Sequence, residues 1–153
     1  MRRYLLWIVG LLLALLLSPV KGADVGRLQP IELLQVVRKG DQIVLTTDTG
    51  DVGRGPTLST AWKNLKETTP GAVFLDTADY LLVTTDTEDL VSQLGELLRP
   101  STLVCMVEQE VDAKAAAQWL SAHTPGVPLR AVRYMGRIPP KIRDTEGRFA
   151  IVD

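Results

Sequence analysis

Asp48, Thr49 and Gly50 form the tripeptide of this sequence that comes closest to a catalytic motif. They follow an apolar run, as the active loop of an aspartic peptidase does. Hydrolysis of that kind needs two carboxylates that share a proton, one of which raises the pKa of the other. The chain holds one complete triplet, so a homodimer would have to supply a second Asp48. The motif therefore predicts a tight turn or, as the alternative, an aspartic-type hydrolase that uses Asp48 in a homodimer.

Acidic residues gather in the middle of the chain. Residues 46–113 hold twelve Asp or Glu and four Lys or Arg. Carboxylate oxygens can bind divalent cations, but the spacing fits no EF-hand loop. Most of these positions are typical of helix caps and first-turn anions, which the helix dipole favours. We expect no metal site and no cofactor.

The C-terminal stretch has the opposite charge. From Gly126 onward there are six basic and three acidic residues. Arg133, Arg137 and Lys141 are the cations that we single out, because such a stretch could contact anionic lipid or a wall polymer. The other interpretation is a solvated strand face that balances the acidic half of the chain.

Histidine and cysteine offer little to a catalytic site. His123 is the one histidine and precedes Thr124, Pro125 and Gly126, which predicts a place at the C-terminus of a helix. Cys105, the one cysteine, lies in an apolar run and is expected to be a small buried side chain. No disulfide can form within the chain, and no Ser-His-Asp or Cys-His site can be assembled.

The N-terminus indicates export. Arg2 and Arg3 are followed by residues 4–17, which carry no charge and are shorter than the ~20 residues of a relaxed membrane span. Residues 1–22 are therefore predicted to be a signal peptide cut before Ala23, with a retained membrane anchor as the alternative. Without them the chain keeps 14 basic and 18 acidic residues, a net charge of −4, which does not favour nucleic-acid binding.

The rest of the chain predicts one small domain. Residues 23–30 are expected to form a linker and residues 31–153 a single extracytoplasmic domain. Two apolar runs, 31–37 and 42–47, flank a Gly-containing turn and predict a hairpin, with a helix over 31–38 as the alternative. Three glycines predict a loop over 48–56.

Helices and strands alternate after that loop. Apolar stripes predict three helices, which we expect to be capped by Thr57, by Thr85 or Asp86, and by Asp112. Residues 73–75 and 80–84 are strand-like and form one bent strand or two. Further strands are predicted over 102–107, 129–134 and 148–152, and the first of these lacks polar alternation, as expected when both faces are buried. The order ββ-α-β(β)-α-β-α-β predicts an α/β (α+β) fold, a mixed sheet covered by about three helices.

A stretch of about half the chain resembles a known family. Residues 57–65 read TLSTAWKNL after a Gly-rich loop, a Pro-Gly pair leads into the next strand, and an amphipathic helix ends in LLRP at 97–100. With the strand over 102–107 and the Ala-rich helix, this is similar to the N-terminal domain of the C subunit of nutrient germinant receptors from spore-forming bacteria. The resemblance implies an exported, non-catalytic, membrane-associated protein with integral-membrane partners. Those subunits carry a lipidated Cys after the leader, which this sequence lacks, and no functional residue is carried over.

These observations together predict a non-enzymatic binding or assembly module outside the cytoplasm, in the cell envelope or in spore germination. The expected partner is a membrane or envelope protein and not a nucleic acid. A retained N-terminus would add membrane association. The alternatives are the Asp48 hydrolase and a wall- or lipid-binding module that uses the basic C-terminal segment.

Overall fold

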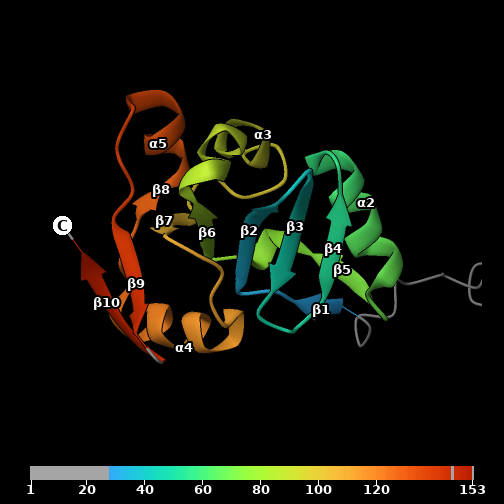
Figure 1. The fold of residues 1–153 in the computed structure, drawn as a ribbon, viewed down its shortest axis with the longest axis horizontal. Helices are drawn as coiled ribbons and strands as arrows, with labels where there is room; N and C mark the ends of the chain where they lie inside the picture. Colours follow the sequence, from blue (N-terminus) through green and yellow to red (C-terminus); the bar gives the residue numbers. More distant parts are fainter. Residues whose placement is uncertain (1–27, 146, 153) are drawn as a thin grey trace, which may run out of the picture.

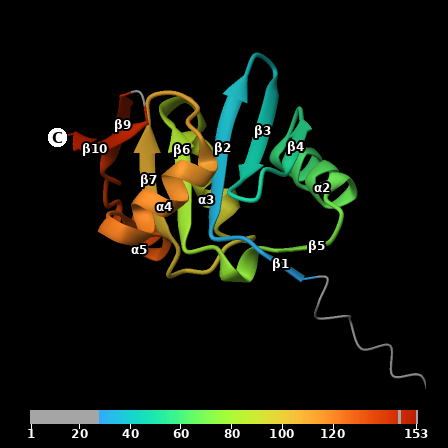
Figure 2. The ribbon, with the colours of Figure 1, turned by 90° about the horizontal axis from the view of Figure 1, so that it is seen from below.

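Runs of Val, Leu and Ile form the centre of one mixed sheet in the computed structural model, which describes residues 28–145 and 147–152. The predicted leader lies outside the described residues. Eight strands make up the sheet, seven of them in the order β10-β9-β7-β6-β2-β3-β4, while β8 pairs with β7 (Figures 1 and 2). Their bounds are β2 Leu33–Lys39, β3 Gln42–Thr47, β4 Val52–Gly55, β6 Tyr80–Thr84, β7 Leu103–Val107, β8 Val127–Pro128, β9 Lys141–Thr145 and β10 Arg148–Val152.

The four central strands β2, β6, β7 and β9 run parallel, and β3, β4 and β10 pair antiparallel towards the edges. All five residues of β6 and the last four of β7 are buried. Continuous apolar strands of this kind need cover on both faces. The prediction of a doubly buried strand over 102–107 is confirmed, and so is the α/β fold class.

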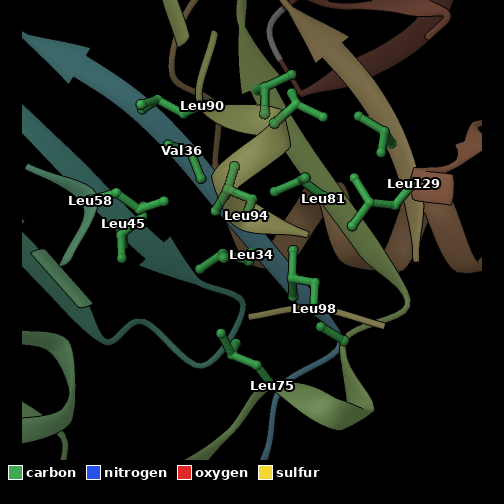
Figure 3. Packing of buried hydrophobic residues seen from close by; sticks show 14 of the residues in the cluster. Leu34, Val36, Leu45, Leu58, Leu75, Leu81, Leu90, Leu94, Leu98 and Leu129 are labelled. Atoms are coloured by element: carbon green, nitrogen blue, oxygen red, sulfur yellow. The ribbon is translucent and has the colours of Figure 1, made fainter. Parts of the chain in front are cut away.

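Helices provide that cover. On one face lie α2 (Leu58–Thr68), α3 (Val91–Leu94) and α5 (Leu129–Met135), and α4 (Ala113–His123) covers the other (Figures 1 and 2). The larger core packs Leu34, Leu45, Leu81 and Leu94 against the first group of helices (Figure 3). These four side chains have no exposed surface. Full burial of one such leucine contributes about 1.5–3 kcal/mol.

The predicted hairpin is confirmed. β2 and β3 pair from Leu34 opposite Thr47 to Lys39 opposite Gln42. Gly40 turns the chain with a φ of 58°, a conformation that glycine adopts without strain. The alternative of a helix over 31–38 is wrong, because these residues alternate between the two cores on either side of the sheet.

The loop predicted over 48–56 contains a strand. β4 pairs with β3, and its two glycines lie against α2. A Cβ on Gly53 would lie 2.4 Å from the carbonyl oxygen of Ala61, and one on Gly55 would lie 2.4 Å from the Thr60 hydroxyl. The glycines here permit a close approach of strand and helix, as they do in other strands. Thr57 caps α2 as predicted, and its hydroxyl accepts from the Thr60 N–H.

The end of the predicted linker also forms a strand. β1 (Leu28–Pro30) pairs in parallel with β5 (Ala72–Phe74), apart from the main sheet. The Thr77 hydroxyl, in the short 3₁₀ helix η2 (Leu75–Thr77), holds the chain there through the N–H and the carbonyl of Ile31, each at 3.0 Å. β5 and β6 are separate strands, which decides between the two arrangements predicted for residues 73–84.

The helix predicted from Thr85 or Asp86 begins as a 3₁₀ helix, η3 (Thr85–Leu90), and continues as the single turn of α3. Its cap is Thr84, which forms a capping box with Thr87, so the predicted capping residues are wrong by one or two positions. The reason is burial: Thr84 and Thr87 are both inside the protein, where backbone N–H groups need a partner. Leu90, Val91, Leu94 and Leu98 face the core as the stripe predicted.

Residues 129–134 were expected to form a strand, and they form helix α5. Pro128, which has no N–H to donate, precedes the helix, and Gly136 ends it with a φ of 62°. Leu129 and the partly buried Val132, three residues apart, both pack on the larger core. That spacing fits a helix, whereas a strand would place the two side chains on opposite faces. The helices capped by Thr57 and Asp112 and the strand over 148–152 are confirmed.

Candidate functional site

Asp48 is placed in a turn whose polar groups bind the backbone. Its Oδ1 accepts hydrogen bonds from the N–H groups of Glu32 and Leu33, both at 3.1 Å. Its own N–H donates to the carbonyl of Leu33 at 3.2 Å. Asp48 thus fastens the end of β3 to the start of β2. Among the described residues no second carboxylate shares a hydrogen bond with it, and these contacts are those of a turn residue.

The acidic residues of the middle region are dispersed among separate interactions. Asp79 pairs with Arg99 at 2.7 Å and Asp89 with Arg38 at 3.2 Å. Asp86 accepts a hydrogen bond from the Thr84 hydroxyl. Within the part of the chain that the structure describes, no three His, Cys, Asp or Glu side chains gather as metal ligands would.

The carboxyl ends of the parallel strands are the place where α/β sheets commonly bind ligands. An open depression of ≈ 370 Å³ lies there, between the ends of β2, β6 and β7. Three of its charged side chains form two ion pairs: Lys39 pairs with Glu110, and Glu108 pairs with Arg143 of β9 at 2.9 Å. The Arg143 guanidinium lowers the pKa of Glu108 by hydrogen bonding and by its charge.

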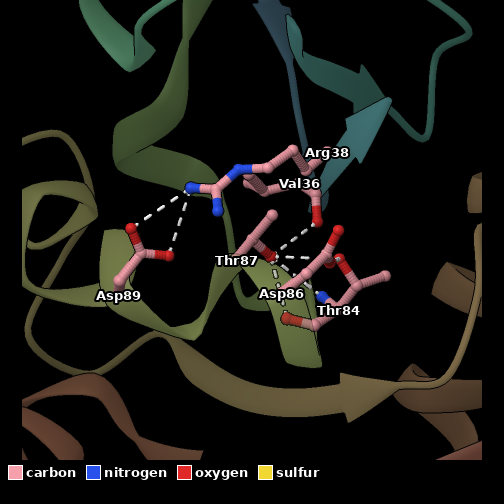
Figure 4. A network of polar contacts seen from close by, with 6 residues as sticks. All are labelled: Val36, Arg38, Thr84, Asp86, Thr87 and Asp89. Carbon is pink, nitrogen blue, oxygen red and sulfur yellow. Dashed lines mark hydrogen bonds and ion pairs between the residues drawn. The ribbon is translucent and has the colours of Figure 1, made fainter. Parts of the chain in front are cut away.

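Beside this depression, Thr87 connects η3 to β2. Its hydroxyl accepts from the N–H of Thr84 at 3.0 Å and lies 3.2 Å from the carbonyl oxygen of Val36 (Figure 4). Arg38 reaches from the end of β2 to both carboxylate oxygens of Asp89, at 3.3 and 3.2 Å (Figure 4). The polar network at these strand ends therefore joins elements of the fold, and its groups are already paired.

Cys105 and His123 are placed as predicted. Cys105 is buried beneath α4, and burial raises the pKa of its thiol to about 12. Such a thiol is a poor nucleophile, because the reactive thiolate is disfavoured. His123 ends α4, where its Nδ1 lies 2.9 Å from the carbonyl oxygen of Trp119 and its ring stacks on that of Trp119 at 4.6 Å.

Arg133, Arg137 and Lys141 lie on or just after α5, beside three apolar side chains that face solvent. Tyr134 is 78% exposed, Met135 75% and Ile138 80%, although large apolar side chains are normally buried. We name this set the α5–β9 surface. It consists of Arg130, Arg133, Tyr134, Met135, Arg137, Ile138 and Lys141.

The backbone under the α5–β9 surface is firmly held. Gly136 and Arg137 both donate their N–H to the carbonyl of Ala131, which closes the end of α5. Pro139 is buried, and the Pro140 carbonyl accepts from the N–H of Met106 in β7 at 2.9 Å. The segment therefore presents its apolar side chains from a fixed turn, and their exposure is a property of the fold.

The charge of this surface has one sign. Residues 129–141 contain four cations and no carboxylate. Within the described residues, none of the four has an acidic group at ion-pair distance, whereas Arg143, just beyond, pairs with Glu108. Arg133 is the most enclosed of the four: its side chain covers Gly95, and it borders a shallow depression together with Glu88 and Asp89.

Sequence reasoning found the cations of this surface and missed its apolar residues. The predicted strand over 129–134 would place Arg130 and Arg133 on opposite faces of the sheet. It ends before Met135 and Ile138, so it predicts no position for their side chains. The signal that could have found them is the combination of Pro128 and Gly136, which delimits a short helix. On that helix Arg130 and Tyr134, four residues apart, share a side.

No protein-family model, no curated protein and no solved structure matches this chain. Among the described helices, none has the length and apolar character needed to cross a membrane.

Proposed function

We propose that this protein is a non-enzymatic module that works outside the cytoplasm at a membrane or envelope surface, and that it binds through the α5–β9 surface. The observation that carries the proposal is the exposure of Tyr134, Met135 and Ile138 next to four cations without an acidic partner among the described residues. Clustered exposed apolar side chains with a polar border mark interaction sites.

The polar residues that could perform chemistry support a binding role over an enzymatic one. The Asp48 carboxylate is engaged with two backbone N–H groups. At the carboxyl ends of the parallel strands, Lys39 pairs with Glu110 and Glu108 pairs with Arg143. A catalytic group needs access to a substrate and a tuned pKa, and the Cys105 thiol is buried and held in its protonated form.

The predicted export segment at residues 1–22 would bring this surface to the outer side of a membrane. The resemblance of residues 50–120 to the C subunit of nutrient germinant receptors would then place the protein beside integral-membrane partners. The export of the chain and its integral-membrane partners are both parts of this proposal.

In-cell photo-crosslinking tests this function. A photo-crosslinking amino acid replaces Ile138 in the full chain, and a control protein carries it at Arg54, an exposed position on β4. We expect adducts with membrane lipids or with membrane and envelope proteins from position 138, identified by mass spectrometry, and none above background from position 54. Equal adducts from both positions, or adducts with cytoplasmic proteins alone, would contradict the proposal.

A further inference from the structure

We infer that the occupant of the α5–β9 surface is an anionic lipid bilayer, into whose interface Tyr134, Met135 and Ile138 insert. This inference rests on the proposed function and adds to it the chemistry of what is bound. It follows from three properties of the surface: its exposed apolar side chains, the cations near them, and its distance from α2 in the described domain.

The exposed apolar side chains suit a bilayer interface. Tyr134 and Met135 end α5, and Ile138 follows two residues after the tight turn at Gly136. The three are at least three-quarters exposed, so no pocket of the protein has to open before they enter lipid. Tyrosine is enriched at the membrane–water boundary, where its ring lies among the headgroups. The Arg133 guanidinium lies 5.4 Å from the centre of that ring, so the two groups would lie at the same depth among the headgroups.

The cations match an anionic headgroup layer. Arg130, Arg137 and Lys141 are exposed, and within the described residues no carboxylate pairs with them. Each cation near an anionic membrane surface strengthens binding by about fivefold. This attraction is local, because the chain without residues 1–22 has a net charge of −4 and would be repelled as a whole. Binding must therefore orient the protein with this surface towards the lipid.

The location of the surface allows such an orientation. α5 lies with β9 and β10 towards one end of the long axis of the described domain, and α2 lies towards the other end, in both views (Figures 1 and 2). A flat bilayer can thus meet α5 and the turn after it without touching α2. A soluble anionic polymer could satisfy the cations but offers no apolar phase for Met135 and Ile138, which favours the bilayer.

A fluorescent probe in the full chain tests this inference. Ile138→Cys is labelled with an environment-sensitive dye, and Arg54→Cys labelled in the same way is the control. Cys105 is buried and should stay unlabelled in the folded protein. The proteins are mixed with vesicles of phosphatidylcholine alone, or with about one part in three phosphatidylglycerol. Because the N-terminal segment is identical in both proteins, a difference between the probes reports on the α5–β9 surface.

We expect a blue-shifted, stronger emission from position 138 on the anionic vesicles and no change from position 54. Adding Arg130→Gln, Arg137→Gln and Lys141→Gln to the position-138 protein should raise the half-saturating lipid concentration by about 100-fold. A control variant with the same loss of charge elsewhere carries Arg54→Gln, Lys63→Gln and Lys114→Gln. These substitutions should raise the half-saturating lipid concentration far less.

An unchanged probe at position 138, an equal response to both kinds of vesicle, or equal loss in the two triple variants would overturn the inference. Protein adducts in the crosslinking experiment together with a silent vesicle probe would refute lipid as the occupant and leave the proposed function standing. If neither crosslinked adducts nor a change in probe emission were observed, both lipid as the occupant and the proposed function would be refuted.

Discussion

At the residue scale, polar side chains next to strand ends bind backbone groups of the neighbouring element. Asp48 accepts from two N–H groups at the start of β2, Thr84 and Thr87 cap η3, and Asp112 caps α4 through the Ala115 N–H at 2.9 Å. Catalytic motifs and caps draw on the same residue types, because both need an oxygen that accepts strongly. The sequence around Asp48 could therefore predict either a catalytic loop or a turn, and its hydrogen bonds are those of a turn residue.

Replacement of Asp48 separates these two roles. Asp48→Ala leaves two N–H groups without their acceptor and should lower the free energy of unfolding by about 1–3 kcal/mol. Asp48→Asn keeps an acceptor oxygen and should cost clearly less, while Asp41→Ala, in the exposed hairpin turn, serves as control. Urea titrations followed by circular dichroism measure all three. Wild-type stability of Asp48→Ala would show that the turn does not depend on this carboxylate.

The ion pair of Glu108 and Arg143 should contribute to the free energy of unfolding in a way that depends on pH in one direction. Arg143 lowers the pKa of Glu108 in the folded protein, so folding favours the ionised carboxylate. The stabilisation is present above the unfolded pKa of the group and is lost as the pH falls through its folded pKa. Glu108→Gln should therefore unfold at lower urea than wild type near neutral pH, and the two proteins should converge in acid. A difference in urea midpoint between the two proteins that persists or widens in acid would contradict the predicted direction of this pH dependence.

At the element scale, patterns of apolar residues predicted most of the elements, and the exceptions have local physical causes. The helices capped by Thr57 and Asp112 could be predicted because each has a cap followed by an apolar stripe. The apolar stripe of α5 did not predict a helix, because seven residues give too few positions to distinguish it from a strand, and only Pro128 and Gly136 mark its ends. β4 escaped prediction because glycine normally marks a loop, whereas here it permits contact with α2.

Gly53→Ala tests that explanation of β4. The added methyl group would lie 2.4 Å from the Ala61 carbonyl oxygen, a backbone atom that cannot move without shifting α2. We expect the free energy of unfolding to fall by about 1–3 kcal/mol, the usual cost of overpacking. Arg54→Ala, the exposed neighbour on the same strand, should have little effect. Chemical denaturation measures both, and equal stability of the two variants would show that β4 and α2 are less closely packed.

At the scale of the whole molecule, the sequence could predict the fold class but not the surface that we propose as functional. The charges of Arg133, Arg137 and Lys141 are visible in the sequence, and a binding role for them was foreseeable. The exposure of their apolar neighbours became evident only from the tertiary structure, because it depends on which elements pack over a residue. Tyr134, Met135 and Ile138 look like core residues until the position of α5 leaves them uncovered.

The α5–β9 surface is the face of the protein that we propose meets a membrane. Hydrogen–deuterium exchange of the full chain, with and without anionic vesicles, tests this proposal most directly because each peptide reports its own amides. We predict slower exchange in peptides that cover residues 129–141 and unchanged exchange in those that cover Leu58–Thr68. Unchanged exchange over 129–141, or equal protection of both segments, would show that this surface is not the membrane-binding face.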